Sequence, residues 1–216
     1  MASSDAAKPS LLLRCKVLVL GDAAVGKSAL VQMFHSKGTH YPKQYVMTTG
    51  CDFVMKELRV PETNTTVELH IFDCSGSETF LDLTTQYWDN VNMIMLVYDA
   101  TNVESFNNVV TWLEMVRKTS PDKPLPGVLV ANKIDLSERV RVHTSEANEF
   151  ARRNDLEFFQ LSAHTNSNVD APFVHLVEAF SKLYDEKLQA LREMQGVLAR
   201  VCIAGLQQQT LETVRE

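Results

Sequence analysis

One stretch constrains the fold of this chain more than any other. Residues 21–28 read Gly-Asp-Ala-Ala-Val-Gly-Lys-Ser and match the pattern G-x-x-x-x-G-K-[ST] in full. An apolar run at residues 11–20 precedes the stretch, and a helical pattern follows from residue 27. Glycines let the backbone curl until its N–H groups face an anion, and the N-terminus of the next helix adds a favourable field. The stretch therefore predicts a strand, a phosphate-binding loop and a helix, in that order.

The rest of the chain alternates short apolar runs with helical patterns. Helices are expected at 27–36, 103–118 and 144–154, and a long one begins near Pro172. The spacing of Thr101 and Glu104 predicts a capping box at the start of the second helix. This alternation predicts an α/β fold with a six-stranded, mostly parallel sheet that helices cover on both faces. The predicted strands are 11–20, 51–60, 65–73, 91–99, 127–132 and 157–161.

Three segments are expected along the 216 residues. Residues 1–11 form a flexible N-terminal tail, 12–186 one domain, and 187–216 a C-terminal amphipathic helical extension. The apolar stripe of this extension either packs on its own domain or docks a partner. The stripe consists of Leu188, Leu191, Met194, Val197, Leu198 and Val201.

Composition excludes several function classes. The net charge of −6 argues against a nucleic-acid-binding protein, and no run of 18 apolar residues predicts a membrane span. The four cysteines show no CxxC spacing, which favours reduced thiols over a metal site or a disulfide framework. The ending carries no prenylation motif, and Ala2 after Met1 excludes N-myristoylation, so no direct lipid anchor is expected.

A second motif, Asn132-Lys133-Ile134-Asp135, follows the expected fifth strand and indicates the base. A carboxylate only accepts hydrogen bonds, and guanine offers two donors on one edge where adenine does not. A buried Asp135 would therefore reject adenine, which disfavours an ATP-using enzyme. Ser162, Ala163 and His164 follow the sixth strand, where the Ala163 N–H would meet the guanine carbonyl. The predicted nucleotide-binding residues are Gly21, Asp22, Ala23, Ala24, Val25, Gly26, Lys27, Ser28, Ala29, Asn132, Lys133, Asp135, Ser162, Ala163 and His164.

With these motifs in order, the chain resembles the Ras superfamily of small GTPases, and most of all its Rab-like members. The resemblance implies GTP/GDP and Mg²⁺ as ligands and two nucleotide-sensing switch segments. Residues 48–53, Thr-Thr-Gly-Cys-Asp-Phe, are similar to the first switch, and residues 72–78, Phe-Asp-Cys-Ser-Gly-Ser-Glu, to the second. It assigns the metal to Ser28, Thr48 and Asp73, and catalytic roles to Lys27, Thr48 and Gly76.

The chain departs from that family at two positions that bear on chemistry. Ser77 stands where the family has the glutamine that orients the attacking water. Ala23 stands where glycine leaves room for water or an arginine finger. A serine is too short to reach both the water and the γ-phosphate, so this small GTPase is expected to hydrolyse GTP very slowly.

Within the superfamily, the chain resembles the Rab-like GTPase subunits of intraflagellar transport complex B. The resemblance rests on residues 21–27, 48–50, 75–77, 125–130 and 171–173 and on the absent prenyl cysteine. It implies the small β-sandwich subunit of that complex and other complex B subunits as partners, and the cytoplasm and cilium or flagellum as location. Two functions stay open: a GTP-gated adaptor with little catalysis, or a vesicle-trafficking GTPase that hydrolyses GTP when a partner supplies the missing group.

Overall fold

The computed structural model describes residues 11–119 and 124–213, with side chains as far as residue 195. It divides into two compact units, Met1–Glu178 and Ala179–Glu216. The first unit contains one six-stranded sheet with the strand order β2-β3-β1-β4-β5-β6. Its strands are β1 (Leu11–Leu20), β2 (Cys51–Arg59), β3 (Thr65–Cys74), β4 (Met93–Asp99), β5 (Gly127–Asn132) and β6 (Leu156–Gln160).

All neighbouring strands of the sheet are parallel except β2 and β3, which form an antiparallel pair. The hairpin between these two strands turns at residues 61–64 and closes with a hydrogen bond from Val60 N to Thr65 O. Every residue of β5 is buried, as expected of a central parallel strand that is covered on both faces. The predicted fold class, an α/β sheet of six mostly parallel strands, is confirmed.

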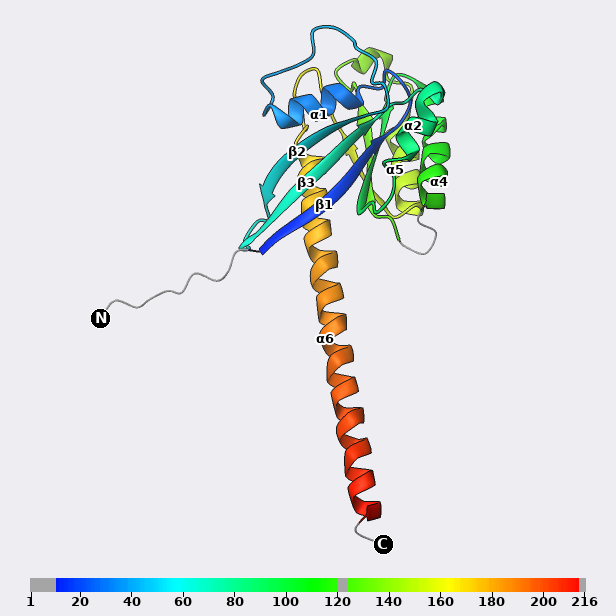
Figure 1. The fold of residues 1–216 in the computed structure, drawn as a ribbon. Helices are drawn as coiled ribbons and strands as arrows, with labels where there is room; N and C mark the ends of the chain where they lie inside the picture. Colours follow the sequence, from blue (N-terminus) through cyan, green and yellow to red (C-terminus); the bar gives the residue numbers. More distant parts are fainter. Residues whose placement is uncertain (1–10, 120–123, 214–216) are drawn as a thin grey trace, which may run out of the picture. The chain divides into compact units, whose positions relative to one another are not determined.

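Helices cover both faces of the sheet. They are α1 (Lys27–His35), α2 (Leu81–Thr85), α3 (Val103–Asn107), α4 (Val109–Thr119), α5 (Thr144–Arg153) and α6 (Ala171–Thr213), with short 3₁₀ turns at Glu78–Phe80 and Ser137–Arg139. Figure 1 shows α1 on one side of the sheet and α2, α4 and α5 on the other. Leu18 and Leu20 point to the second side, where they join a buried cluster with Trp112 of α4. On the α1 side, the Phe34 ring stacks on Phe173 with centroids 3.7 Å apart.

The helix predicted over 103–118 is divided at Asn108 into two helices, α3 and α4. The predicted capping box is also wrong. Asn102, not Thr101, caps α3, and its side-chain oxygen accepts from Glu104 N at 2.9 Å and Ser105 N at 3.3 Å. The Thr101 hydroxyl instead donates to Asp99 Oδ1 at 2.7 Å. Asparagine is at least as good a helix cap as threonine, so of the two neighbouring residues the asparagine caps the helix.

The second unit is the later part of α6, which continues without a break to Thr213. Residues 1–10 of the expected tail lie outside the described residues, and so do the side chains of Val197, Leu198 and Val201. Among the described residues, no helix combines the length and hydropathy needed to cross a membrane.

Candidate nucleotide-binding site

The loop between β1 and α1 surrounds a buried ammonium group. Lys27 is only 6% exposed, and its Nζ donates to the carbonyl oxygens of Gly21 and Asp22 at 2.7 Å each. Burial lowers the pKa of Lys27 to about 8, although nearby carboxylates oppose the shift. A buried cation whose hydrogen bonds, among the described residues, go to neutral carbonyls is well placed for an anionic ligand.

The loop adopts backbone conformations that explain its composition. Gly21 has φ of 139°, and a Cβ added there would lie 2.0 Å from the Val97 carbonyl oxygen. Gly26 has φ of 96° and leaves room only for the Asn132 side chain. Ala24 also lies in the left-handed region, at φ of 61°, where a side chain is strained. The sequence pattern did not reveal this last feature.

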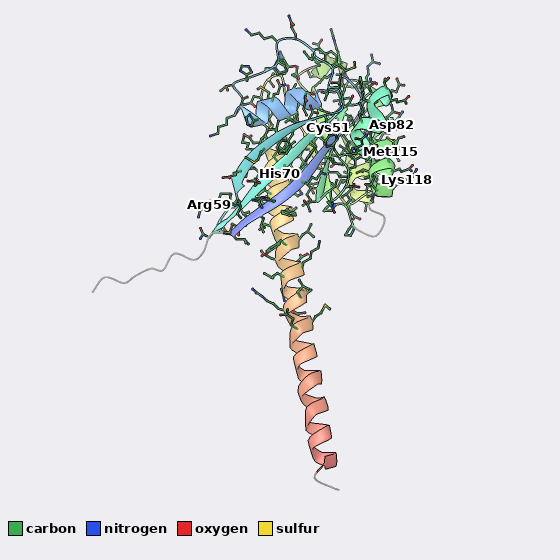
Figure 2. The ribbon with its side chains drawn as sticks, in the orientation of Figure 1. Cys51, Arg59, His70, Asp82, Met115 and Lys118 are labelled. Atoms are coloured by element: carbon green, nitrogen blue, oxygen red, sulfur yellow. The ribbon has the colours of Figure 1, made fainter. Side chains whose placement is uncertain are left out.

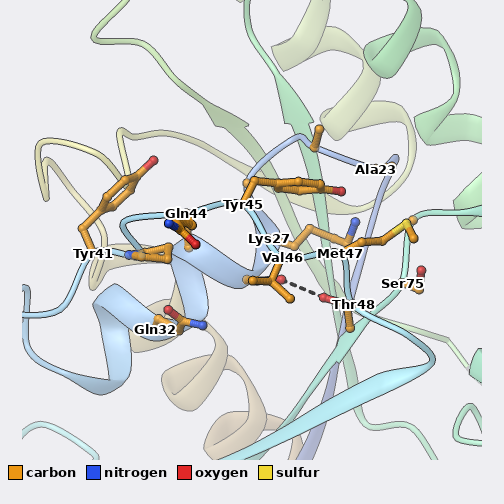
Figure 3. Close-up of a pocket in the computed structure, with 16 residues that line it drawn as sticks. Ala23, Lys27, Gln32, Tyr41, Gln44, Tyr45, Val46, Met47, Thr48 and Ser75 are labelled. Atoms are coloured by element: carbon orange, nitrogen blue, oxygen red, sulfur yellow. Dashed lines mark hydrogen bonds between the residues drawn. The ribbon is translucent and has the colours of Figure 1, made fainter.

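Three side chains that were expected to bind a metal lie together beside this loop. Ser28 Oγ and Thr48 Oγ1 are 3.0 Å apart (Figure 3). Two oxygens at adjacent corners of an octahedron around Mg²⁺, each about 2.1 Å from the ion, would be separated by about 3.0 Å. Asp73 is 2% exposed, and its Oδ1 has no hydrogen-bond partner among the described residues. Burial raises the pKa of Asp73 to about 6, so this carboxylate favours a cation nearby. The three residues therefore fit Mg²⁺.

A cavity of about 240 Å³ opens over the loop and is closed on one side by both expected switch segments (Figure 3). Thr48 lines it from the first segment, next to Met47, and Ser75 and Gly76 line it from the second. A Cβ on Gly76 would lie 2.2 Å from the Asp22 carbonyl carbon, so only glycine allows this approach. Among the described residues that line the cavity, Ser77 does not appear.

A second cavity of about 240 Å³ adjoins the first, and the two share Gly26, Ala29 and Tyr41. Its further lining comes from two loops that follow β5 and β6. The residues are Asn132, Lys133, Asp135, Leu136, Ala163 and His164. The predicted phosphate-binding and base-binding residues thus form neighbouring parts of one site, as a nucleotide requires.

Asn132 and Lys133 fix the base loop to the phosphate loop. Asn132 Nδ2 donates to Val25 O at 2.9 Å, while Lys133 Nζ donates to Ala24 O at 2.7 Å. Lys133 also forms an ion pair with Asp99 at 2.7 Å, and this contact helps to keep the pKa of Asp99 low despite its burial. The sequence analysis missed Asp99, although its position at the end of β4 is a place where ligand-binding residues gather in parallel sheets.

Asp135 faces the second cavity with its carboxylate partly exposed, at 20% of the side-chain surface. Ser162 Oγ donates to Asp135 Oδ1 at 2.6 Å and so orients the carboxylate. The Ala163 N–H donates to Asn132 Oδ1 at 3.1 Å, while His164 packs edge-on against Tyr41. Tyr41 was also missed, because the loop that carries it has no recognisable motif.

Comparison with known proteins agrees with this geometry. The model of the Ras family matches residues 16–182. The chain belongs to the Ras family. Intraflagellar transport protein 27 homolog of Homo sapiens is 46% identical over 182 residues, which cover 84% of this chain and 98% of that protein. Intraflagellar transport protein 27 of Chlamydomonas reinhardtii is 40% identical, with 84% and 91% covered, and Ras-related protein Rab-1 of Theileria parva is 36% identical, with 76% and 73% covered.

Ras-family GTPases bind GTP or GDP with Mg²⁺ and hydrolyse GTP. The residues of this family member fit those ligands. Lys27 and the backbone of its loop would hold the phosphates, Ser28, Thr48 and Asp73 the metal, and Asp135 the base. When bound, the metal supplies positive charge beside the phosphates, and the chain's own residues position the groups around it.

Proposed function

We propose that this Ras-family member is a GTP/GDP switch with very slow hydrolysis of its own. It acts as a subunit or adaptor in intraflagellar transport. One observation carries the proposal: Lys27, Thr48 and Gly76 meet around one cavity, yet no glutamine follows Gly76. A site of this kind distinguishes GTP from GDP through its switch segments, because only GTP brings a γ-phosphate to them.

Slow hydrolysis follows from Ser77. Its backbone N–H faces Ser75 Oγ at 3.3 Å, and its side chain ends at one hydroxyl. Such a group does not extend to an attacking water in the cavity that Ser75 and Gly76 line. Ala23 also lines this cavity and takes up space there. We infer a rate no faster than the intrinsic rate of Ras, about 3–5 × 10⁻⁴ s⁻¹.

The partners are inferred from relatives that are named for intraflagellar transport. We assign the small β-sandwich subunit and other subunits of complex B as partners, and the cytoplasm and cilium or flagellum as location. A row of aromatic rings supports the inference that a partner binds at the two switch segments. Phe53, Phe72 and Tyr87 follow one another with centroids 5.2 Å and 5.9 Å apart, and Phe53 is 55% exposed. An exposed aromatic row between two switch segments is typical of a docking surface.

A second function is a trafficking GTPase that hydrolyses GTP when a partner supplies the missing group. The observation in its favour is that Lys27, Thr48 and Gly76 line the cavity, whereas Ser77, in the glutamine position, is not among its described lining residues. In other GTPases a group supplied by a partner accelerates hydrolysis by about 10³–10⁵-fold.

The test begins with the nucleotide that copurifies with the full chain, identified by chromatography. Single-turnover GTP hydrolysis is then compared among the wild type, Ser77→Gln and the matched control Ser77→Ala. Guanine nucleotide, negligible turnover, a faster Gln variant and an unchanged Ala variant would support the proposal. Brisk turnover in the wild type would refute slow hydrolysis, and recovery of adenine nucleotide would refute the site assignment itself.

Adding the purified complex B partners to the same assay separates the two functions. An adaptor keeps its slow rate in their presence, whereas the second function requires a large acceleration. Lys27→Ala should lose nucleotide in either case, because no other Lys or Arg is among the described residues that line the first cavity.

A further inference from the structure

Two cysteines face each other where the antiparallel pair β2–β3 meets the switch segments. Cys51 is the first residue of β2, Cys74 is the last of β3, and the two are direct partners in the strand register. Their Sγ atoms are 3.0 Å apart. In Figure 2, Cys51 lies at the end of the strand pair opposite to Arg59. Their separation of 23 positions hides this contact in the sequence.

The backbone around the two cysteines is suited to a covalent bond. Ser75 N donates to Gly50 O at 2.7 Å, so the flanking residues make the ladder hydrogen bond and the cysteines occupy a non-hydrogen-bonded position. Opposed residues at such positions have Cα atoms about 4.5 Å apart. Disulfides accept Cα separations of about 4.4–6.8 Å. The two sulfurs can therefore join without a change of strand register.

The alternative use of two adjacent thiols is a metal site. In the part of the chain that the structure describes, no group of three or more His, Cys, Asp or Glu side chains could hold a metal ion. Cys51 Sγ lies 3.0 Å from Cys74 Sγ and 4.0 Å from the Thr84 carbonyl oxygen. The surroundings favour thiol chemistry between the pair.

We propose that Cys51 and Cys74 are a modification site that a small disulfide oxidant, of the glutathione type, converts into a cross-strand disulfide. Cys51 is partly exposed and Cys74 is fully buried, so Cys51 reacts first. The Cys51 sulfur attacks the oxidant, RSSR, and releases one RSH. The Cys74 sulfur then attacks Cys51 and releases the second RSH. Two cysteine thiols are oxidised, one disulfide of the oxidant is reduced, and their two protons leave on the two RSH molecules.

The position of the bond gives it a consequence. Cys51 lies three residues after Thr48, and Cys74 lies between Asp73 and the Ser75–Gly76 stretch. The disulfide therefore joins the backbone of the first switch segment to that of the second. Separation of the end of β2 from β3 would no longer be possible, and nucleotide release that needs this opening becomes slower. This consequence rests on the proposed function, whereas the disulfide itself does not.

The experiment uses the full reduced chain, loaded with GDP and Mg²⁺ and incubated with oxidised glutathione. Free thiols are alkylated, and the protein is digested and analysed by mass spectrometry. The expected product lacks two hydrogen atoms, joins the Cys51 and Cys74 peptides, and reverts with dithiothreitol. Cys202→Ser is the matched control and should still form it, whereas Cys51→Ser should not.

Three results would overturn the proposal: a stable glutathione adduct on Cys51, pairing of either cysteine with Cys15 or Cys202, or both thiols still free. Release of a fluorescent GDP analogue is measured on the same samples. Slower release after oxidation in wild type and Cys202→Ser, but not in Cys51→Ser, supports the consequence, and equal rates refute it. A chain that forms the disulfide but retains no guanine nucleotide would instead overturn the proposed function alone.

Discussion

Replacement of Asp22 by alanine should destabilise the protein although the residue lies in a surface loop. Its carboxylate accepts hydrogen bonds from Asn108 Nδ2 and from Trp112 Nε1, each at 2.8 Å. Trp112 is 5% exposed, so its N–H would lose its partner in a place that water hardly reaches. A buried donor left unpaired costs about 1–3 kcal/mol, and hydrogen bonds to charged groups contribute about 1.5–3 kcal/mol. We expect the free energy of unfolding to fall by about 3 kcal/mol.

The assay is urea unfolding of the GDP·Mg²⁺ form followed by circular dichroism, repeated at two nucleotide concentrations to separate folding from binding. With a slope of about 3 kcal/mol per molar, the urea midpoint should fall by about 1 M. Asp22→Asn keeps one acceptor and should lose about 1 kcal/mol. The exposed Asp89→Ala serves as the control and should change the free energy by less than about 0.5 kcal/mol.

A double-mutant cycle with Trp112→Phe isolates the contact. If Asp22 acts through the indole N–H, the two substitutions should couple by about 1.5–3 kcal/mol. Asp22→Ala that matches Asp89→Ala, or additive effects in the cycle, would refute the reasoning, because both outcomes mean that Trp112 finds another partner.

Three shorter predictions follow from the site. Ala24→Gly should raise the free energy of unfolding by about 0.5–1 kcal/mol. It removes the strain of a left-handed alanine, and this gain exceeds the extra conformational entropy that glycine loses on folding. An unchanged urea midpoint would contradict this prediction. Gly76→Ala should keep its affinity for GDP but bind GTP analogues more weakly, because the Cβ of the new alanine would meet the Asp22 backbone. Equal loss of affinity for both nucleotides in a fluorescence titration would count against this prediction. The Mg²⁺ affinity of the GDP-bound chain should fall about tenfold per pH unit below about pH 6, where the raised pKa of Asp73 lets a proton compete with the ion. Asp73→Asn should bind Mg²⁺ weakly and with a shallower pH dependence that comes from the terminal phosphate of GDP, whose second pKa is about 6. A wild type with the same shallow dependence would exclude Asp73 as a titrating group.

Those parts of the fold that short-range patterns encode could be predicted from the sequence. The buried strand β5, Gly127–Asn132, was expected with the bounds the structure gives, because an apolar run with clear ends defines it. Helix α2 was missed because Leu81–Thr85 is too short to show a helical period. The break at Asn108 was missed because the residue is compatible with a helix, and its side chain contacts Asp22, 86 positions away. Such contacts arise from tertiary structure and leave no local signal.

The same distinction applies to the site. Motif positions could be predicted because each needs a particular residue type beside a phosphate, a metal or a base. The contacts that hold these motif residues in place could not be predicted from the sequence. Asp99 was not recognised as the ion-pair partner of Lys133, and Tyr41 lies between two cavities without any motif around it. The strain at Ala24 also depends on the path of the loop, which Lys133 Nζ and the Ala24 carbonyl help to define.

These supporting contacts are distributed unevenly, and that distribution bears on how a switch of this kind can work. Asp22 is bonded to α4, while Val25 and Ala24 are bonded to the base loop through Asn132 and Lys133. The phosphate loop is thus fixed by side-chain hydrogen bonds to two distant parts of the domain. The first switch segment and the residues just before it expose apolar side chains instead, with Phe53 at 55% and Val46 at 78%. A rigid loop can hold the shared phosphates of GDP and GTP equally, which leaves the difference between them to the exposed segments that a partner can contact.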